Sequence, residues 1–466
     1  MDQAQLDRFV KKMQLGGLPA IAIESFSRAV RFVAEGGATT IGEDQIENVA
    51  ALESLEGLRE YEEVGRKASN RAVVIKLNGG LGTSMGLSRA KSLLPVRAGI
   101  SFLDLIARQT LAQRASWGSE LPLVLMNSYR TRDETLAALA EYEDLATDIP
   151  LDFLQHRVPR IDTDTWAPVE WAADESLEWC PPGHGDLYIA MKSSGMLDQL
   201  LAKGIRWAFV SNADNLGAVL DARVLGWVAA NEIPFAMEVA ERTEADKKGG
   251  HLARMNGRLM LREVAQCKEE DLVSFQDVAK YRYFNTNNLW LDLEALSREL
   301  DAAPGGLALP IIANEKQVSA SDDTSPRCFQ LETAMGSAIA CFEGAQAIVV
   351  PRDRFAPVKT TNELLMLWSD AYEVTIDSRM VLADPESQRD LVIDLDTRFY
   401  GTVEKLAERF AEGPPSLAKC RRLRVVGDHS FGAGVVFEGE AQLVNETSEQ
   451  VHVPDGSVIG SVIGDE

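Results

Sequence analysis

Cysteine is scarce in this sequence, with five residues in 466. The five are widely scattered and none belongs to a C-x-x-C pair, which excludes both a dense disulfide framework and the paired spacing of a zinc site. We therefore expect reduced thiols inside a cytoplasmic protein, at Cys180, Cys267, Cys328, Cys341 and Cys420.

Basic residues are also in short supply. The chain has 47 lysines and arginines against 71 aspartates and glutamates, so its formal net charge is −24. Such a surface repels a polyanion over the Debye length of roughly 8 Å, and no block of basic residues compensates. We therefore expect no nucleic-acid partner, although a small anionic substrate can still bind in a local positive pocket.

Long apolar runs are absent as well. None approaches the roughly 18 residues of a membrane-spanning helix, and no secretory leader is recognisable, so we expect a soluble cytoplasmic chain without membrane contact. Apolar residues at 45% and charged residues at 25% are ordinary values for a globular protein, which excludes disordered and fibrous classes. At this length, two or three domains are expected.

Residues 1–70 have the periodicity of amphipathic helices. Apolar side chains recur at positions i, i+3, i+4 and i+7, namely Leu6, Phe9, Val10 and Met13, and a second stripe includes Ile23, Phe26 and Val30. We expect this helical segment to cover one face of a sheet.

Residues 71–385 alternate short apolar strands with helical stretches, which predicts an α/β domain with a parallel or mixed sheet. Ligands in such folds bind beyond the carboxyl ends of the strands, and polar clusters fall at these ends, at 127–130, 155–160 and 211–215. The expected strands are 72–77, 121–126, 152–155, 207–211, 235–239 and 346–350.

Residues 386–466 differ in texture. Short β segments alternate with Gly, Asp and Asn, which indicates a separate β-solenoid-like domain. Every chemical motif lies upstream of it, so we expect this domain to pack or oligomerise rather than to catalyse.

The stretch VVIKLNGGLGTSMGLSRAKS, residues 73–92, combines an apolar strand, a glycine-rich loop and a lysine. Glycines at 79, 80, 82 and 86 let backbone N–H groups approach an anion closely, and Lys91 adds a full positive charge. Two familiar loops are excluded by spacing, because a Walker loop needs glycine where Ala90 stands and a dinucleotide fingerprint needs glycine where Met85 stands. The second exclusion also removes a nicotinamide-dependent oxidoreductase.

Three further segments carry candidate chemistry. In FVSNADNLGA (209–218), Asp214 follows a buried strand, where its carboxylate either binds Mg²⁺ or caps the next helix. WCPPGHGD (179–186) is a stiff loop around a histidine that could hold a base or a sugar. FNTNNLW (284–290) concentrates amides, which suit sugar hydroxyls. An irregular turn is the alternative for both of the latter.

Together these segments resemble the eukaryotic-type UDP-glucose pyrophosphorylase (UTP–glucose-1-phosphate uridylyltransferase) family. The matches run in order through residues 70–375: KLNGGLGTSMG (76–86) followed by Lys91, PLVLMNS (122–128), FLQHRVPRI (153–161), PPGHGD (181–186), FVSNADNLGA (209–218), ERTEADKKGGHL (241–252), FNTNNLW (284–290), QLETAMGSAI (330–339) and PRDRFAPVKTTNELL (351–365). The family's second loop lysine is replaced here by Arg89, so only Lys91 carries over from that run.

The resemblance implies an α/β nucleotidyltransferase fold, glycosyltransferase-A-like and Rossmann-type, with a mixed-sheet core, N-terminal helices and a C-terminal β-helix-like domain. It places nucleotide contacts on Leu81, Gly82, Gln155, Gly183 and Asn212. It places sugar contacts on His184, Gly250, Glu263, Asn287 and Asn288. Asp214 becomes the metal ligand, and Lys91 and Lys359 become the catalytic cations. We expect the helix 360–372 to begin directly behind Lys359.

The implied reaction joins UTP and glucose 1-phosphate into UDP-glucose and pyrophosphate, with Mg²⁺ as cofactor. A sugar phosphate is already an anion, so catalysis needs alignment and charge neutralisation rather than a general base. Galactose 1-phosphate and N-acetylglucosamine 1-phosphate remain alternative substrates, and a non-catalytic nucleotide-sugar binder is a further alternative. A homo-oligomer formed through the C-terminal domain is possible on this sequence.

Overall fold

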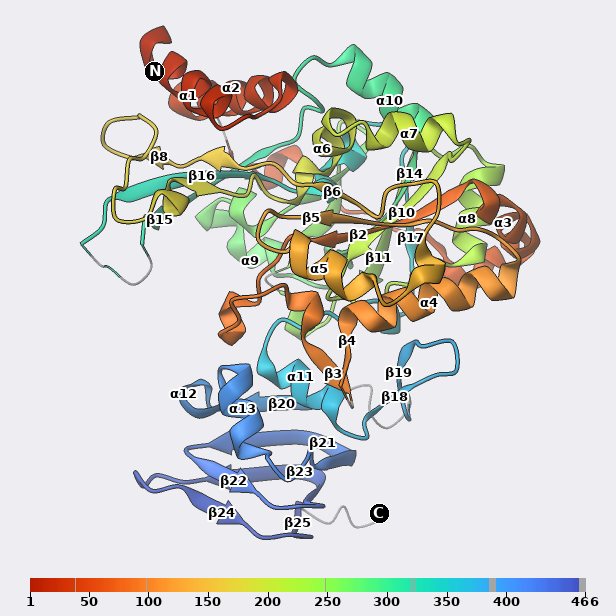
Figure 1. Ribbon diagram of the computed structural model, residues 1–466, viewed down its shortest axis with the longest axis vertical. Coiled ribbons are helices and arrows are strands. Elements are labelled where there is room, and N and C mark those ends of the chain that lie inside the picture. Colours follow the sequence, from red (N-terminus) through yellow and green to blue (C-terminus); the bar gives the residue numbers. More distant parts are fainter. Residues whose placement is uncertain are drawn as a thin grey trace.

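The computed structural model describes residues 1–460 except 38, 98, 248, 320, 321, 323 and 385–390 (Figure 1). The expected boundary between residues 385 and 386 therefore lies outside the described residues. Within the described part, no helix is both long and apolar enough to cross a membrane.

A ten-stranded mixed sheet forms the centre of the molecule, in the order β1-β17-β11-β14-β10-β2-β5-β6, with β12 and β13 attached beside β14. β14 runs antiparallel to β10 and β11, and the other neighbouring pairs along this order are parallel. All six expected strands are present. The bounds are β1 Glu53–Ser54, β2 Ala72–Asn78, β5 Leu123–Asn127, β6 Asp152–Leu154, β10 Trp207–Asn212, β11 Phe235–Glu241, β12 His251–Met255, β13 Arg258–Arg262, β14 Tyr283–Asp292 and β17 Gln346–Val349.

Helices cover both faces of this sheet, so its inner strands are apolar on both sides. In β2, Val74 packs into one apolar cluster and Val73 and Ile75 into the other. The first cluster includes side chains of α4 (Phe102–Trp117) and α8 (Ala222–Ala230), with α3 (Glu62–Ala68) and α5 (Arg132–Leu139) nearby (Figure 1). The second includes α6 (Leu187–Ser193), α7 (Met196–Ala202) and α10 (Leu293–Ala302). The expected α/β core is confirmed.

The two N-terminal helices, α1 (Gln3–Leu15) and α2 (Ala20–Ala34), cover a sheet as expected, but it is a second, smaller one. That sheet contains β15 (Ile311–Gln317), β16 (Arg327–Thr333) and β8 (Ile161–Asp162). The rings of Phe9 and Phe26 meet with centroids 5.7 Å apart between the helices. The central sheet had no free face left, because the later helices already cover it.

The C-terminal region is a parallel β-helix, which confirms the β-helix-like expectation. One sheet contains β20 (Val392–Leu395), β21 (Ser416–Val426), β23 (Val436–Val444) and β25 (Val458–Gly460), and the other contains β22 (His429–Phe431) and β24 (Val451–Val453). Buried Leu423, Phe431 and Phe437 fill the space inside. Two short helices, α12 (Thr397–Tyr400) and α13 (Val403–Arg409), cover one end (Figure 1).

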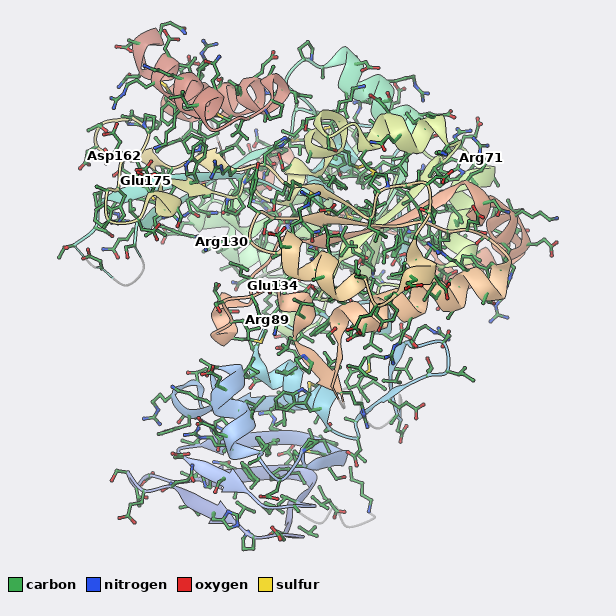
Figure 2. All side chains as sticks on the ribbon, in the orientation of Figure 1. Arg71, Arg89, Arg130, Glu134, Asp162 and Glu175 are labelled. Carbon is green, nitrogen blue, oxygen red and sulfur yellow. The ribbon has the colours of Figure 1, made fainter. Side chains whose placement is uncertain are left out.

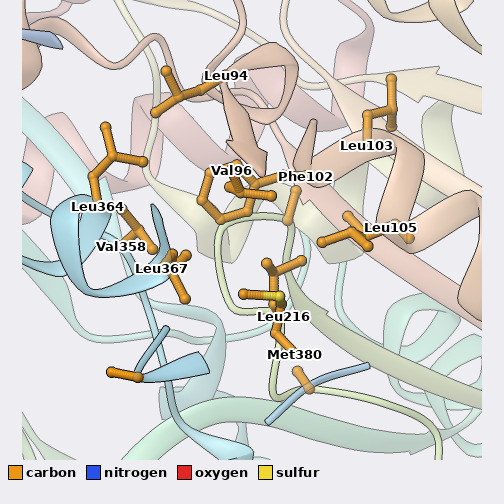
Figure 3. Close-up of a cluster of buried hydrophobic side chains, with 14 of the residues drawn as sticks. Leu94, Val96, Phe102, Leu103, Leu105, Leu216, Val358, Leu364, Leu367 and Met380 are labelled. Carbon is orange, nitrogen blue, oxygen red and sulfur yellow. The ribbon is translucent and has the colours of Figure 1, made fainter. Parts of the chain in front are cut away.

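The central α/β part and the C-terminal part share one apolar cluster, in which α11 (Thr361–Trp368) lies near β20 with Ile393 and Leu395. Figure 3 shows the side of this cluster that belongs to the central part. Val96 and Phe102 from the start of the chain pack there with Leu216, Val358 and Leu364. The cluster thus joins three segments that each carry a predicted catalytic residue. Minor elements complete the list: β3 Pro95–Arg97, β4 Ile100–Ser101, β7 Val158–Pro159, β9 Trp179–Cys180, α9 Leu272–Phe275, β18 Tyr372–Val374 and β19 Met380–Leu382.

The expected helix 360–372 is too long. It ends at Trp368, because Ser369 has an extended backbone, and β18 begins at Tyr372. Asp370 instead turns towards the C-terminal domain, where its carboxylate accepts hydrogen bonds from the backbone N–H groups of Leu417 (2.7 Å) and Ala418 (3.0 Å).

Two glycines set the distance between α3 and α8. A Cβ atom at Gly65 would lie 1.7 Å from the carbonyl oxygen of Ala222, and one at Gly226 would lie 1.9 Å from that of Tyr61. Gly65→Ala must therefore push the helices apart, and we expect it to lower the free energy of unfolding by about 1–3 kcal/mol. Thermal and urea unfolding measure this loss.

Gly57→Ala is the matched control. Its Cβ atom would meet only the end of the flexible Glu53 side chain, which can move aside. Equal stability of the Gly65→Ala and Gly57→Ala variants would contradict this account of the helix contact.

Candidate functional site

The carboxyl ends of β2, β6 and β10 open into a cleft with a volume of about 310 Å³. Residues far apart in sequence meet on its walls, as expected for polar residues that follow neighbouring parallel strands. Six predicted site residues line it, namely Lys91, Gln155, Gly183, His184, Asn212 and Asp214.

The glycine-rich loop forms one wall of the cleft. β2 ends at Asn78, and Gly79 and Gly80 line the cleft directly behind it. The two ends of the loop are joined by backbone contacts. The Lys91 N–H donates to the carbonyl of Gly80 (3.1 Å), and Leu81 forms a β-bridge with Ala90. Leu81 and Gly82 lie on this loop beyond the cleft lining. These contacts place Lys91 next to Gly80, where the loop begins.

Lys91 and Asp214 form an ion pair in the cleft. Lys91 Nζ lies 2.7 Å from Asp214 Oδ2, and the two side chains are 15% and 22% exposed. Asp214 does not cap a helix, since α8 begins at Ala222 and Asp221 is its N-cap. In the described part of the chain, no group of three or more His, Cys, Asp or Glu side chains could hold a metal by itself.

Gln155 follows β6 and lines the same cleft, with its Oε1 next to Gly79. Its Nε2 donates to the carbonyl of Gly183 (3.1 Å), which links the strand end to the PPGHGD loop. Asp186 holds the same turn, because its carboxylate accepts from the His156 backbone N–H (2.7 Å) and bonds the His156 ring at Nδ1 (2.8 Å). Asp186 was overlooked in the sequence, although its place in the PPGHGD motif was a usable signal.

His184 is held in one protonation state. The Met335 backbone N–H donates to His184 Nδ1 at 2.9 Å, so this nitrogen is an acceptor. Burial lowers the pKa of His184 to about 4, so the ring is neutral at physiological pH. The proton of a neutral imidazole whose Nδ1 accepts resides on Nε2, which makes His184 a hydrogen-bond donor in the cleft.

Three further predicted residues lie together beyond the cleft lining. A Cβ atom at Gly250 would lie 2.5 Å from Glu263 Oε2, so these two are in contact. Burial raises the pKa of the Glu263 carboxyl, and the nearby charge of Lys359 opposes that shift. Lys359 itself is exposed, and its carbonyl accepts a hydrogen bond from Ser84 Oγ of the glycine-rich loop (3.4 Å).

The two predicted amides on β14 are engaged inside the protein. Asn287 has a left-handed backbone (φ 59°) and accepts from Asn285 Nδ2 at 2.8 Å. Asn288 has no exposed surface, and its Nδ2 donates to Glu238 Oε2 (3.0 Å) and to the carbonyl of Arg354 (3.2 Å). The Asn288 amide therefore belongs to a buried network behind the cleft.

Lys76 belongs to the buried layer behind the cleft as well, and its role was not predicted. It is 3% exposed, and its Nζ donates to Ser211 Oγ (2.7 Å) and to the carbonyl of Ala218 (2.6 Å), at the two ends of the loop that carries Asp214. Burial, together with repulsion from Arg354, lowers the pKa of Lys76 to about 7. A lysine inside an apolar strand was the available sequence signal.

Arg89 lies outside the site. Its side chain is exposed on the glycine-rich loop, 3.6 Å from Glu134 of α5 (Figure 2). This position agrees with its omission from the catalytic set.

A family model and several curated relatives match most of this chain. The family model for UTP–glucose-1-phosphate uridylyltransferase matches residues 23–438. The enzyme of that name from Solanum tuberosum is 39% identical over 418 residues, which cover 89% of this chain and 85% of the relative. That from Hordeum vulgare is 40% identical, over 84% of this chain and 80% of the relative.

Solved structures agree. A UDP-glucose pyrophosphorylase from Leishmania major, solved in open and closed forms, matches with a TM-score of 0.92 and 42% identity, covering 98% of both chains. A point mutant of the same enzyme, solved in complex with UDP-glucose, has a TM-score of 0.92 and 43% identity, again over 98% of both chains.

The buried Lys76 should make stability depend on pH. The unfolded chain keeps this lysine charged up to a pKa near 10.5, whereas the folded protein releases the proton near pH 7. Above pH 7 the unfolded state therefore binds the extra proton, and the native protein gains stability as the pH rises. Lys76→Met removes the titrating group. The free energy of unfolding of the unsubstituted protein minus that of Lys76→Met should therefore rise by up to about 1.4 kcal/mol per pH unit.

Urea unfolding of both proteins between about pH 6 and pH 9 measures this difference. We expect it to be constant below pH 7 and to grow above it. A difference that stays constant across the whole range would show that Lys76 keeps its proton in the folded state.

Proposed function

Because the chain belongs to the UTP–glucose-1-phosphate uridylyltransferase family, it transfers a uridylyl group from UTP to glucose 1-phosphate, and we propose that Lys91, Asp214 and Lys359 carry out this transfer. The observation that carries the proposal is the Lys91–Asp214 pair at 2.7 Å beside the open backbone of Gly80. A cation, a carboxylate and an open glycine backbone in one cleft suit a triphosphate and its metal.

The reaction is an in-line attack of the sugar phosphate oxygen on the α-phosphorus of UTP, with pyrophosphate as the leaving group. The attacking oxygen is already ionised, so the residues need not remove a proton. Their task is to align two anions that repel each other and to offset charge as it moves to the pyrophosphate. Lys91 comes from the glycine-rich loop and Lys359 from the segment 351–359, whose end contacts that loop through Ser84.

Enzymes of this family use a divalent metal, and we propose that it is Mg²⁺. Asp214 is a single carboxylate without a supporting cluster among the described residues, which fits an ion that takes one carboxylate and completes its shell with substrate phosphates and water. The bound ion would supply positive charge at the α- and β-phosphates. In this structure Lys91 Nζ donates a hydrogen bond to the Asp214 carboxylate.

For the rest of the substrate, we propose the residues that the resemblance implies. Leu81, Gly82, Gln155, Gly183 and Asn212 would contact the nucleotide. Gln155 is well placed for the uracil edge, because its amide lies in the cleft between Gly183, whose carbonyl accepts from Nε2, and Gly79, where a Cβ atom would lie 2.6 Å from Oε1. His184, Gly250, Glu263 and Asn287 would serve the sugar, with His184 Nε2–H as a donor and the Glu263 carboxylate as an acceptor. Asn288 has no exposed surface and would support them from the buried network behind the cleft.

A coupled assay of pyrophosphate release from UTP and glucose 1-phosphate, with and without Mg²⁺, tests the function. Parallel assays with galactose 1-phosphate and N-acetylglucosamine 1-phosphate test the sugar. The family match does not favour these two sugars. We expect them to react more slowly, and equal rates would contradict the assignment of glucose.

We propose three parts, 1–70, 71–385 and 386–466, with self-association through the last, where Val444, Val451 and Val458 are exposed apolar side chains. Light scattering of the whole chain tests the assembly. We also propose a cytoplasmic location, which the five free thiols support because they suit a reducing compartment.

Asp214→Asn should abolish most activity with little change in stability. The amide is nearly isosteric but brings no charge to a metal, and Asp214 caps no helix whose loss would unfold the protein. Initial rates over a range of Mg²⁺ concentrations and the thermal midpoint measure the two effects. A variant that keeps its rate and loses stability would show that Asp214 is structural.

Lys359→Ala should lower kcat about 10²–10³-fold, because a preorganised charge at the transition state contributes about 3–4 kcal/mol. Lys91→Ala should have a similar effect. Arg89→Ala is the control on the same loop, since its side chain is exposed and directed to Glu134, and it should keep kcat within a few-fold. A Lys359→Ala enzyme with more than about half of the native kcat would remove this residue from the phosphate site.

A further inference from the structure

The segment that leads to Lys359 is bound along its length to the loop that carries Asp214. Asn215 makes most of these contacts. Its Oδ1 accepts from the backbone N–H of Ala356 (2.9 Å), and its Nδ2 donates to the carbonyl of Arg354 (3.1 Å). One step further, the backbone N–H of Val358 donates to the carbonyl of Asp214 (3.2 Å). Lys359 is the next residue.

The two segments are also in close steric contact. A Cβ atom at Gly217 would lie 2.1 Å from the carbonyl oxygen of Asp353, so glycine is needed for this approach. Leu216 and Val358 pack in the same apolar cluster below the contact (Figure 3). Asn215 is 2% exposed, so its amide bonds are made away from water, where a lost partner is costly.

Both sides of this contact rest on one buried ion pair. The guanidinium of Arg354 donates to both carboxylate oxygens of Glu238 (2.6 and 2.9 Å) and to the carbonyl of Val219 (2.9 Å). Asn288 joins the set, because its Oδ1 accepts from Asn215 Nδ2 (3.3 Å) while its Nδ2 donates to Glu238.

From this geometry we propose that Asn215 is a positioning residue that fixes Lys359 relative to Asp214. Asn288 acts with it from β14. The inference deepens the proposed function and rests on it, since it explains how the two charged groups of the same site keep their spacing. The Lys359 side chain is exposed, so the backbone that Asn215 holds decides where its ammonium group can reach. Alignment of this kind is a large part of catalysis between two bound anions.

A double-mutant cycle tests the proposal. Asn215→Ala should lower kcat about tenfold in the native background, with less than a twofold change in KM for UTP. Four of the five proposed nucleotide residues lie on other elements, and the fifth, Asn212, is bound by the backbone N–H of Asn215, which the substitution keeps. In the Lys359→Ala background the same change should lower kcat by less than about twofold. Equal losses in both backgrounds would overturn the proposal, since Asn215 would then act through Asp214 or through general stability.

Asn445→Ala is the matched control. Asn445 is also buried, its Nδ2 donates to two backbone carbonyls (2.9 and 2.7 Å), and its Oδ1 accepts from a backbone N–H (3.0 Å). It lies in the C-terminal β-helix, far from the site in sequence. It should lose stability as Asn215→Ala does and leave kcat unchanged. Asn215→Asp keeps the acceptor for Ala356 and the side-chain volume but removes the donor to the Arg354 carbonyl, so it should also lower kcat; it serves if Asn215→Ala does not fold.

Amide hydrogen exchange gives a readout that does not depend on activity. The N–H groups of Ala356 and Val358 should exchange faster in the Asn215 variant that folds and keep native protection in Asn445→Ala. If the native enzyme releases no pyrophosphate with any of the three sugar phosphates, the proposed function fails, and exchange alone decides whether Asn215 holds this segment. Native protection in the Asn215 variant overturns the inference whatever the enzyme catalyses.

Discussion

Glu238 has no exposed surface, yet its carboxylate accepts hydrogen bonds from Arg354, Asn288 and Trp290 Nε1. A buried ion pair gains little net stability, because the loss of solvation offsets most of the attraction. Removal of either partner is costly, however, since it leaves a charge unpaired in the interior. The pair therefore acts as a constraint: Arg354 must stay above β11 in one orientation.

That constraint reaches the reaction through the backbone. Arg354 begins the segment that ends at Lys359, and its guanidinium and its carbonyl both bind the Asp214 loop, through Val219 and Asn215. Lys76 holds the same loop from below, at Ser211 and Ala218. The apolar cluster of Figure 3 adds Leu94, three residues after Lys91, to Leu216 and Val358. Three charged groups from distant parts of the chain thus share one rigid support.

The same arrangement explains how a chain with a net charge of −24 handles two polyanions. The proposed catalytic cations are only two: Lys91 lines the cleft, and Lys359 lies beyond its lining, on the segment bound to the Asp214 loop. Lys91 pairs with Asp214, and the positive charge of Lys359 opposes the rise that burial causes in the pKa of the half-buried Glu263 carboxyl. The C-terminal region also contacts the glycine-rich loop, because a Cβ atom at Gly86 would lie 2.9 Å from the side chain of Thr402.

The sequence by itself determined the strands, the glycine-rich loop and the family. These are local signals, since β-branched runs, glycines and ordered motifs can be read within a few residues. It also placed Gln155 and Asp214 at strand ends, which predicted that they meet, and His184 in a stiff loop. Only the tertiary structure decided that α1 and α2 cover a second sheet and that α11 stops at Trp368. It likewise revealed that Asn288 and Lys76 serve a buried network, because their partners, Glu238, Ser211 and Ala218, are distant in sequence. Hydrogen bonds between remote segments leave no periodic trace, so no local pattern could have shown them.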